Sequence, residues 1–265
     1  MNPKDRKTAL VAFTFPEEKS DQLLQACRDA DTTLQGALVA AANFALAVVA
    51  QNPYLKTVCG IHPRFSFTLS ADVNPPIFLA CHQTCQVPMS LRKVGRHVPE
   101  PSFGLFVCGC SVDRELSPSS RFWDLAAYTK TVMKNSLIDS YHTIGMIWYA
   151  PDLRDIRKKR SAPFKNQRLS SLEVSNLGKV ALEPAYTDSN GHKVTLKGCQ
   201  FFQSVHFEGP LATLSVASLG KRISVSLNFP LPLLNEQQGA LFRDIFLLSL
   251  THSIANKDLQ LRELF

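Results

Sequence analysis

Histidine is the first residue type to consider, because it is the usual general acid or base near neutral pH. The chain contains seven histidines: His62, His82, His97, His142, His192, His206 and His252. His206 stands out because it falls on the same face of a predicted strand as Ser204. This placement suits either a base beside a hydroxyl or a hydrogen-bonded histidine on a sheet face. The sequence contains no G-x-S-x-G, P-loop, G-x-G-x-x-G or H-E-x-x-H motif.

Cysteine is the second residue type with possible chemistry. Cys81 and Cys85 are spaced C-x-x-x-C in a predicted loop, and Cys108 and Cys110 could complete a zinc site. Without any C-x-x-C pair, reduced and buried cysteines explain the same residues, and the sequence predicts no metal site. The odd total of seven cysteines and the lack of a secretory signal favour a reducing, cytoplasmic location.

Positive charge is concentrated in one stretch of the chain. The formal net charge is +7, and seven cations lie between Arg154 and Arg168. Arg157 to Arg160 could bind nucleic acid or form a solvated loop. No aromatic residues interleave with these four charges, and no nucleic-acid-binding fold pattern surrounds them. We therefore expect no nucleic-acid partner.

The elements that must position these residues are a mixture of strands and helices. We expect strands at 9–15, 64–73, 103–112, 172–180, 214–218 and 223–229, and helices after Pro16, at 32–50, at 121–135 and after Asn235. Thr32 with Gln35, and Asn235 with Gln238, match the capping-box pattern. Residues 74–101 and 185–197 are expected to be irregular, the latter turning at Ser189 to Gly191.

Domain organisation and membrane insertion follow from length and apolar runs. The 265 residues contain no clear linker, so we expect a single α/β domain over 1–265, with a mixed sheet flanked by helices. The longest apolar run, Gly36 to Ala50, is too short to span a bilayer, which requires about 18–20 residues. The run belongs instead to a helix that is apolar on nearly every side, as expected in the centre of a large core.

Four motifs together resemble one protein superfamily. They are Thr33 to Ala41, Phe122 to Ala126, Val174 to Gly178 (V-S-N-L-G) and Gly220 to Pro232 with the helix that follows. In this order and spacing they resemble the C-terminal half of the alcohol acetyltransferase and condensation-domain superfamily, which has the chloramphenicol acetyltransferase-like fold. The resemblance covers nearly the whole chain.

This resemblance implies acyl transfer from a thioester, on coenzyme A or a carrier protein, to a hydroxyl or amine. Acyl-CoA is then a possible co-substrate, the acceptor is a small molecule, and no bound cofactor is expected. The resemblance further implies a substrate channel between two similar halves, for which the candidate residues are Ser175, Asn176, Gly178, Ser204 and His206. A tight turn explains Ser175, Asn176 and Gly178 equally well.

The sequence departs from the superfamily at its catalytic motif. In that motif, His-x-x-x-Asp, the histidine is the general base. The residues four positions after the seven histidines are Ser66, Gln86, Pro101, Met146, Leu196, Pro210 and Asn256. An arginine expected after the strand that ends near Val73 is also replaced. We therefore assign no catalytic residue, and two hypotheses remain: an acyltransferase that needs an N-terminal half, or a non-catalytic relative that binds an acyl ligand or a partner. Either one predicts an exposed apolar face and a tendency to self-associate.

Overall fold

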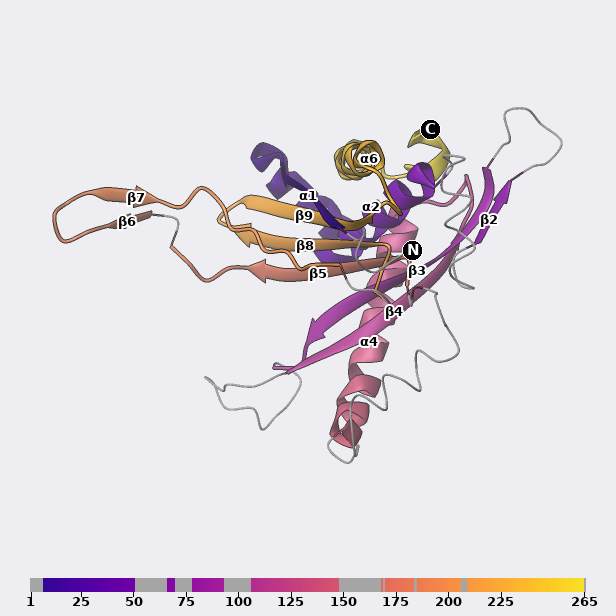
Figure 1. Ribbon diagram of the computed structural model, residues 1–265, viewed down its shortest axis with the longest axis horizontal. Helices are drawn as coiled ribbons and strands as arrows, with labels where there is room; N and C mark the ends of the chain where they lie inside the picture. The colour runs from indigo at the N-terminus through magenta and orange to yellow at the C-terminus, as the bar shows by residue number, and fades with distance from the viewer. Residues whose placement is uncertain are drawn as a thin grey trace.

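A computed structural model describes residues 7–50, 66–69, 78–92, 106–147, 168, 170–183, 185–205 and 209–264. Their main feature is a seven-stranded mixed sheet (Figure 1). Six strands follow the order β1-β9-β8-β5-β3-β2, and the seventh, β4, lies off this order and pairs with β3. The strands are β1 (Lys7–Phe15), β2 (Ser66–Leu69), β3 (Phe78–Ser90), β4 (Val107–Leu116), β5 (Leu172–Lys179), β8 (Ala212–Leu219) and β9 (Arg222–Leu231).

Parallel and antiparallel pairings meet at β5. This strand runs parallel to both of its neighbours, pairing Cys85 with Leu172 and Val174 with Leu214. The remaining pairs, including the β8–β9 hairpin that turns at Gly220, are antiparallel. Gly220 has a φ of +61°, a conformation that a side chain disfavours. The mixed α/β sheet predicted from the sequence is therefore confirmed.

Helices cover one face of this sheet. They are α1 (Glu17–Asp29), α2 (Leu34–Val49), α4 (Phe122–Ile147) and α6 (Glu236–Ala255), followed by the short 3-10 helix η4 (Leu261–Leu264). Helix α2 is buried on nearly every side, as its apolar sequence predicts. It packs in one continuous core with the apolar side chains of β5, β8 and β9, and with α6 and α4.

Two close approaches fix the helices. A Cβ atom on Gly36 of α2 would lie 2.5 Å from the carbonyl oxygen of Ala126, so the backbones of α2 and α4 are in direct contact there. A Cβ atom on Gly239 of α6 would lie 2.3 Å from the ring of Phe229, which presses this helix against β9. The predicted capping box of Asn235 with Gln238 is present at the start of α6.

The N-terminus of α2 corrects one sequence-based expectation. The N-cap is Thr33, whose side chain accepts a hydrogen bond from Gly36 N at 3.1 Å, and not Thr32. Thr32 instead donates to the carbonyl oxygen of Ala126 at 2.7 Å. A buried threonine with a tertiary partner is therefore not free to cap its own helix.

Within 74–101, which was expected to be irregular, the structure departs furthest from the prediction. Residues Phe78–Ser90 form the thirteen-residue strand β3 and are not irregular. The five prolines of this stretch predicted irregular structure, because proline removes a donor from a sheet, and one of them, Pro88, lies within β3. Among the described strands, however, β3 pairs only with β4 beyond Gln86, so no second neighbour there requires the missing N–H of Pro88.

Three other boundaries differ from expectation. Helix α4 continues to Ile147, well past Asn135. The connection 185–197 contains a small hairpin, β6 (Ala185–Thr187) and β7 (Lys193–Thr195), which projects beyond the main sheet (Figure 1). Residues 199–205 are irregular, although their alternation predicted a strand.

The face of the sheet opposite the helices is lined with polar side chains. This polar face comprises Glu173, Ser175, Thr213, Ser215, Ser224, Ser226 and Asn228. Glu173, Thr213 and Asn228 lie in one row across three strands, and Ser175, Ser215 and Ser226 in the next. The alternation of serine with Ile223, Val225 and Leu227 in β9 produces this division.

An irregular segment crosses the polar face, and we call residues 196–205 the strap. Gly198 lies against Ser224, Val205 N donates to Thr8 Oγ1 at 3.1 Å, and Gln203 Nε2 donates to Glu173 Oε1 at 2.7 Å. These contacts reach β9, β1 and β5 in turn. The strap thus binds to the polar face through single polar contacts and not through a sheet ladder.

Among the described helices, none could cross a bilayer by itself; α1 and α2 meet the length and hydropathy requirement only together, across a 99° bend.

Candidate substrate channel

The V-S-N-L-G motif makes a tight turn inside β5, near its end. The register with β8 shifts between Asn176 and Lys179, and Lys179 pairs again with Ser218, so the strand continues past the end expected from the motif. Asn176 Oδ1 accepts a hydrogen bond from Gly178 N at 2.8 Å, and Gly178 has a φ of +72°. Glycine tolerates this left-handed conformation and the amide of Asn176 closes the turn, as the residue types predict. Ser175 lies one position earlier, on the polar face and opposite Ser215 of β8.

A cavity of about 300 Å³ opens beside this turn. It lies between the end of β5, the start of α2, the end of β3 and the side of α4. Its lining residues are Gln35, Pro88, Met89, Ser90, Met133, Lys134, Leu137 and Asn176. Most of the wall is apolar, and two carboxamides and one hydroxyl provide neutral hydrogen-bonding groups. Such a wall can hold an acyl chain and orient a carbonyl group.

Gln35 connects the cavity to the sheet. Its Nε2 donates at 3.0 Å to the carbonyl oxygen of Val174, the first residue of the V-S-N-L-G motif. Its Oε1 atom is buried and has no hydrogen-bond partner among the described residues. Because a buried carboxamide oxygen without a partner is costly, Gln35 can accept a hydrogen bond from a group that enters the cavity.

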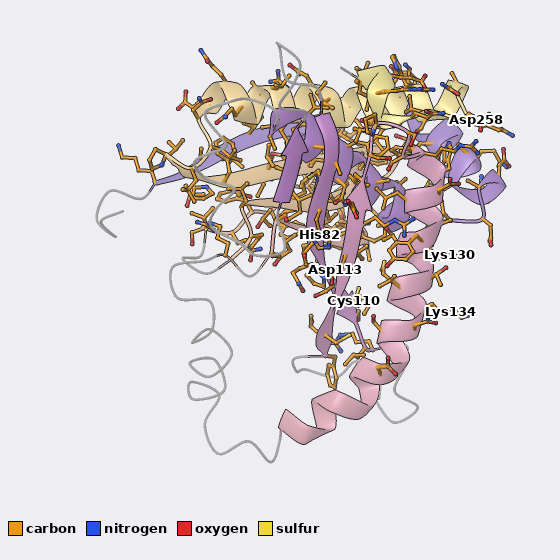
Figure 2. All side chains as sticks on the ribbon, turned by 90° about the vertical axis from the view of Figure 1, so that its right-hand side faces the viewer. His82, Cys110, Asp113, Lys130, Lys134 and Asp258 are labelled. Atoms are coloured by element: carbon orange, nitrogen blue, oxygen red, sulfur yellow. The ribbon has the colours of Figure 1, made fainter. Side chains whose placement is uncertain are left out.

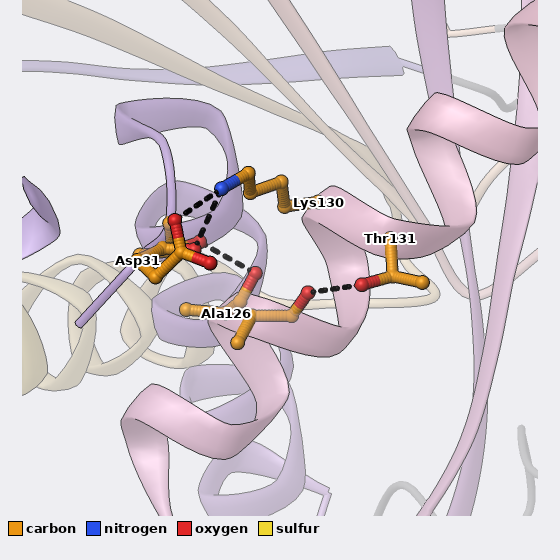
Figure 3. Close-up of polar contacts among 6 residues, drawn as sticks. Asp31, Ala126, Lys130 and Thr131 are labelled. Carbon is orange, nitrogen blue, oxygen red and sulfur yellow. Dashed lines mark hydrogen bonds and ion pairs between the residues drawn. The ribbon is translucent and has the colours of Figure 1, made fainter.

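An ion pair at the α1–α2 turn helps to hold the start of α2 in place. Lys130 Nζ lies 2.6 Å from Asp31 Oδ1 and also donates to the backbone oxygen of Asp31 at 2.9 Å (Figure 3). The Lys130 ammonium holds the pKa of the Asp31 carboxyl below its ordinary value. Asp31 itself has a positive φ of 45°, so this turn is fixed both by its backbone and by α4.

Helix α4 contributes one cation to the mouth of the cavity. Lys134 is exposed and lies one turn beyond Lys130 on the same helix (Figure 2). Lys130 is engaged with Asp31, whereas Lys134 lines the cavity. Within the described part of the chain, the cavity wall therefore contains one charged side chain, and it is positive.

The five predicted channel residues do not all come together. Asn176 lines the cavity, whereas Ser175 lies on the polar face and Gly178 in the turn, and neither belongs to the cavity lining. Ser204 is exposed and lies in the strap, away from the cavity lining. His206 lies outside the described residues. The expected pairing of Ser204 with His206 on one strand face is wrong for Ser204, because residues 199–205 are not a strand.

Sequence reasoning missed most of the cavity wall. Gln35 was assigned only a capping role, and Met89 and Ser90 fell in a stretch expected to be irregular. Lys134 carried no signal, because an isolated lysine on a helix is ordinary. The described histidine side chains, His82, His192 and His252, are absent from the cavity lining.

Glu173 is a partly buried acidic group of the polar face. Burial raises the pKa of its carboxyl above the ordinary value, and the hydrogen bond from Gln203 partly opposes this effect. The carboxyl group lies in the row next to Ser175 but outside the cavity lining. Its desolvation follows from its place beneath the strap.

The cysteines considered for zinc do not lie in a loop. Cys81 and Cys85 belong to β3 and are fully buried on its helix-covered face, and Cys110 of β4 is buried there too. Burial raises the pKa of the Cys110 thiol to about 11 and that of Cys27 in α1 to about 12. Burial also raises the pKa of the Cys85 thiol. No cluster of three or more metal-binding side chains occurs among the described residues.

Comparisons with known proteins give fold information only. No protein-family model matches the chain, and no curated protein matches it in sequence. Solved structures do match: the condensation domain of the Monacolin K polyketide synthase MokA gives a TM-score of 0.58 at 10% identity, covering 96% of this chain and 49% of that chain.

Two further structures agree. The SgcC5 protein from Streptomyces globisporus gives a TM-score of 0.57 at 15% identity, covering 96% of this chain and 50% of that one. A four-domain nonribosomal peptide synthetase, holo-AB3403, gives 0.59 at 13% identity, covering 97% of this chain and 17% of that chain. The protein thus spans half or less of these structures. It has the fold of the C-terminal half of a condensation domain, in the chloramphenicol acetyltransferase-like class predicted from its motifs.

Proposed function

We propose that the protein forms one wall of the substrate channel of an acyltransferase and that a second half provides the catalytic base. The cavity beside Asn176 carries this proposal. It lies at the V-S-N-L-G turn, where the resemblance implies the channel, and its wall combines apolar side chains with neutral hydrogen-bonding groups. The substrates of the proposed reaction are an acyl thioester, on coenzyme A or a carrier protein, and a hydroxyl or amine acceptor.

Each group in the wall has a role in this proposal. Met89, Met133 and Leu137 hold the acyl chain and exclude water from it. Gln35 and Asn176 orient the polar part of the thioester arm. Lys134 attracts an anionic group at the mouth, such as the phosphate of coenzyme A or of a carrier arm. Without a histidine or carboxylate in the described wall, deprotonation of the acceptor falls to the second half.

Binding of butyryl-CoA tests this function directly by calorimetry. We expect saturable binding without release of free CoA when an alcohol acceptor is added. Lys134→Met should weaken binding by up to about fivefold, and salt should reduce the effect. Lys179→Met is the matched control, because Lys179 is exposed on β5 and does not line the cavity.

A second pair of variants tests the cavity itself. Ser90 is exposed at the end of β3 and lines the cavity, so Ser90→Trp should block it, while Ser90→Ala, which removes only the hydroxyl, should weaken binding far less. Equal binding by Ser90→Trp and the wild type would place the ligand elsewhere. Turnover of butyryl-CoA by this chain alone would show that the base need not come from a second half.

The partner surface in this proposal lies at the free end of the sheet. Large apolar side chains are exposed there at the β5 turn, on the projecting hairpin and in the strap: Leu177, Leu182, Tyr186, Val194 and Phe202. Leu177 and Phe202 are exposed by 62% and 63%. Large apolar side chains exposed in number are typical of an interaction site, and we assign them to contact with the second half.

Sizing chromatography tests the partner surface. In the absence of the second half, we expect concentration-dependent self-association, because this apolar surface is then uncovered. The double variant Leu177→Asp, Phe202→Ser should be monomeric over the same concentration range. A wild-type chain that is strictly monomeric and monodisperse would overturn the assignment.

The non-catalytic alternative keeps the same cavity and surface. It predicts binding of butyryl-CoA and association with a partner, but no turnover when the first half of a condensation-type enzyme is supplied in trans. Release of free CoA in that reconstituted mixture favours the acyltransferase over this alternative.

A further inference from the structure

A second cavity lies on the helical side of the molecule, where α1, α4 and α6 meet. Its volume is about 510 Å³, within the range of small-molecule sites. Trp123 and Ser253 lie at its base and are buried. The small side chains of Ala26 and Ala127 leave room between the helices. None of its lining residues belongs to the candidate channel.

The aromatic wall of this cavity is held in a fixed orientation. Trp123 Nε1 donates to the backbone oxygen of Ser253 at 3.1 Å. The indole also packs edge-on against Phe122, with ring centroids 4.9 Å apart and an interplanar angle of 86°. Because a hydrogen bond and a ring contact both restrain it, the indole offers a preformed apolar surface to a ligand.

The rim of the cavity is acidic on two sides. Asp29 lies at the end of α1, and Asp124 lies in the first turn of α4. The helix dipole explains Asp124 but disfavours Asp29, because a carboxylate destabilises the C-terminus of a helix. Gln25 Nε2 donates to Asp29 Oδ1 at 2.7 Å. In the described part of the chain, neither carboxylate belongs to an ion pair.

We propose that this cavity binds a small organic cation, an ammonium group on a flat apolar body. The ammonium lies at the rim between Asp29 and Asp124, where two negative charges attract it. The apolar body lies against Trp123, whose ring excludes water from it. Lys257 lies at the same rim and weakens binding by repulsion. The inference does not depend on the proposed acyl transfer.

Fluorescence of Trp123 gives a direct test. The chain has two tryptophans, so the Trp148→Phe variant reports on Trp123 alone. Titration with phenethylamine at neutral pH and low salt should change the emission saturably. The neutral 2-phenylethanol should bind more weakly and phenylacetate more weakly still, because the three probes share a ring and differ in charge.

Charge variants with opposite expected signs complete the test. Asp29→Asn should weaken phenethylamine binding about three- to fivefold, since an exposed charge pair is modest in strength. Lys257→Ala should strengthen it about twofold. Arg243→Ala is the control. Arg243 belongs to helix α6, which also contributes Ser253 and Ile254 to the cavity, but it lies outside the lining, so its loss should leave the affinity for phenethylamine unchanged.

Three outcomes would overturn the proposal. The first is equal affinity for phenethylamine and 2-phenylethanol. The second is unchanged affinity in Asp29→Asn, provided that its thermal unfolding matches that of the parent. The third is the absence of any saturable change in both Trp123 emission and the NMR signals of Ala26 and Ala127 at millimolar phenethylamine.

Discussion

The two faces of the β8–β9 hairpin are both buried, but they have opposite chemistry. Val225 and Leu227 point to the helices and join the apolar core. Ser226 and Asn228 alternate with them on the polar face and are as inaccessible as the core, at 1% and 0% exposure. On the first face, the buried side chains pack against other apolar side chains. On the second face, burial places hydroxyl and amide groups beneath the strap.

Hydrogen bonding sharpens this difference. Ser215 Oγ, Ser226 Oγ and both polar atoms of Asn228 are buried without a hydrogen-bond partner in the described part of the chain. Each such group costs about 1–3 kcal/mol relative to a satisfied one. On this hairpin, the helix-covered face therefore stabilises the fold, and the polar face is where stability is given up. Consecutive residues of one strand, Ser226 and Leu227, allow the two faces to be compared directly.

Leu227→Ala should have the largest effect. Leu227 is completely buried in the core between the sheet and the helices. Its truncation removes apolar contacts and leaves a cavity, so we expect the free energy of unfolding to fall by about 2–5 kcal/mol. Urea denaturation measures the change. A loss below about 1 kcal/mol would mean that the helical face is loosely packed and the contrast between the faces is smaller than inferred.

Ser226→Ala should have the opposite sign. It removes a buried hydroxyl that has no partner in the described chain, and alanine fits the same space. We expect the free energy of unfolding to rise by about 1 kcal/mol in the same urea assay. A loss of stability would reveal a partner for the hydroxyl and would make the two faces more alike.

Glu173→Gln should have a smaller, pH-dependent effect. Burial raises the pKa of Glu173, so the folded state binds its proton more tightly than the unfolded chain does. The stabilisation is complete below the unfolded pKa and is lost as the pH rises through the folded pKa. At neutral pH, Glu173→Gln should therefore be more stable than the wild type, by less than about 1 kcal/mol after solvent screening.

Unfolding measured from acidic to neutral pH checks this sign. The difference between Glu173→Gln and the wild type should shrink toward low pH, where the wild-type carboxyl is protonated. Glu183→Gln is the control, because Glu183 is exposed. A wild type that gains stability relative to Glu173→Gln as the pH rises would contradict the assigned direction.

Gln203→Ala should produce the smallest change. The Gln203 amide donates to Glu173 and lowers the carboxyl pKa against the larger effect of burial. Without that donor, the pKa of Glu173 should rise further, as followed by an NMR titration of its side-chain carboxyl. A fall in pKa would mean that the strap mainly buries Glu173 and that its amide does not stabilise the charged form.

Local sequence patterns predicted the elements whose chemistry is local. The alternation of Ile223 to Phe229, the apolar helix after Thr33 and the Asn235 cap each depend on neighbours within a few residues, and the structure contains all three. Strand β3 was missed because its tolerance of Pro88 depends on which strands lie beside it. That information comes only from the assembled sheet.

The candidate channel shows the same limit. Asn176 was predicted because its turn is local and a motif marks it. Gln35, Met89 and Lys134 join it from three other elements, separated by tens of residues in the sequence. No periodicity links such positions. The wall of a cavity between elements is a property of packing, and single-sequence reasoning finds only the part that lies on a recognisable turn.

The distribution of thiols has a practical consequence for spectroscopy. Cys27, Cys81, Cys85 and Cys110 are buried, and burial suppresses the reactive thiolate form wherever the pKa is raised, as it is for Cys27, Cys85 and Cys110. Cys108 and Cys199 are partly accessible. In a Cys59→Ser, Cys108→Ser background, Cys199 in the strap is the remaining partly accessible thiol and the one open to maleimide. A dye placed there would report strap movement through its emission and anisotropy.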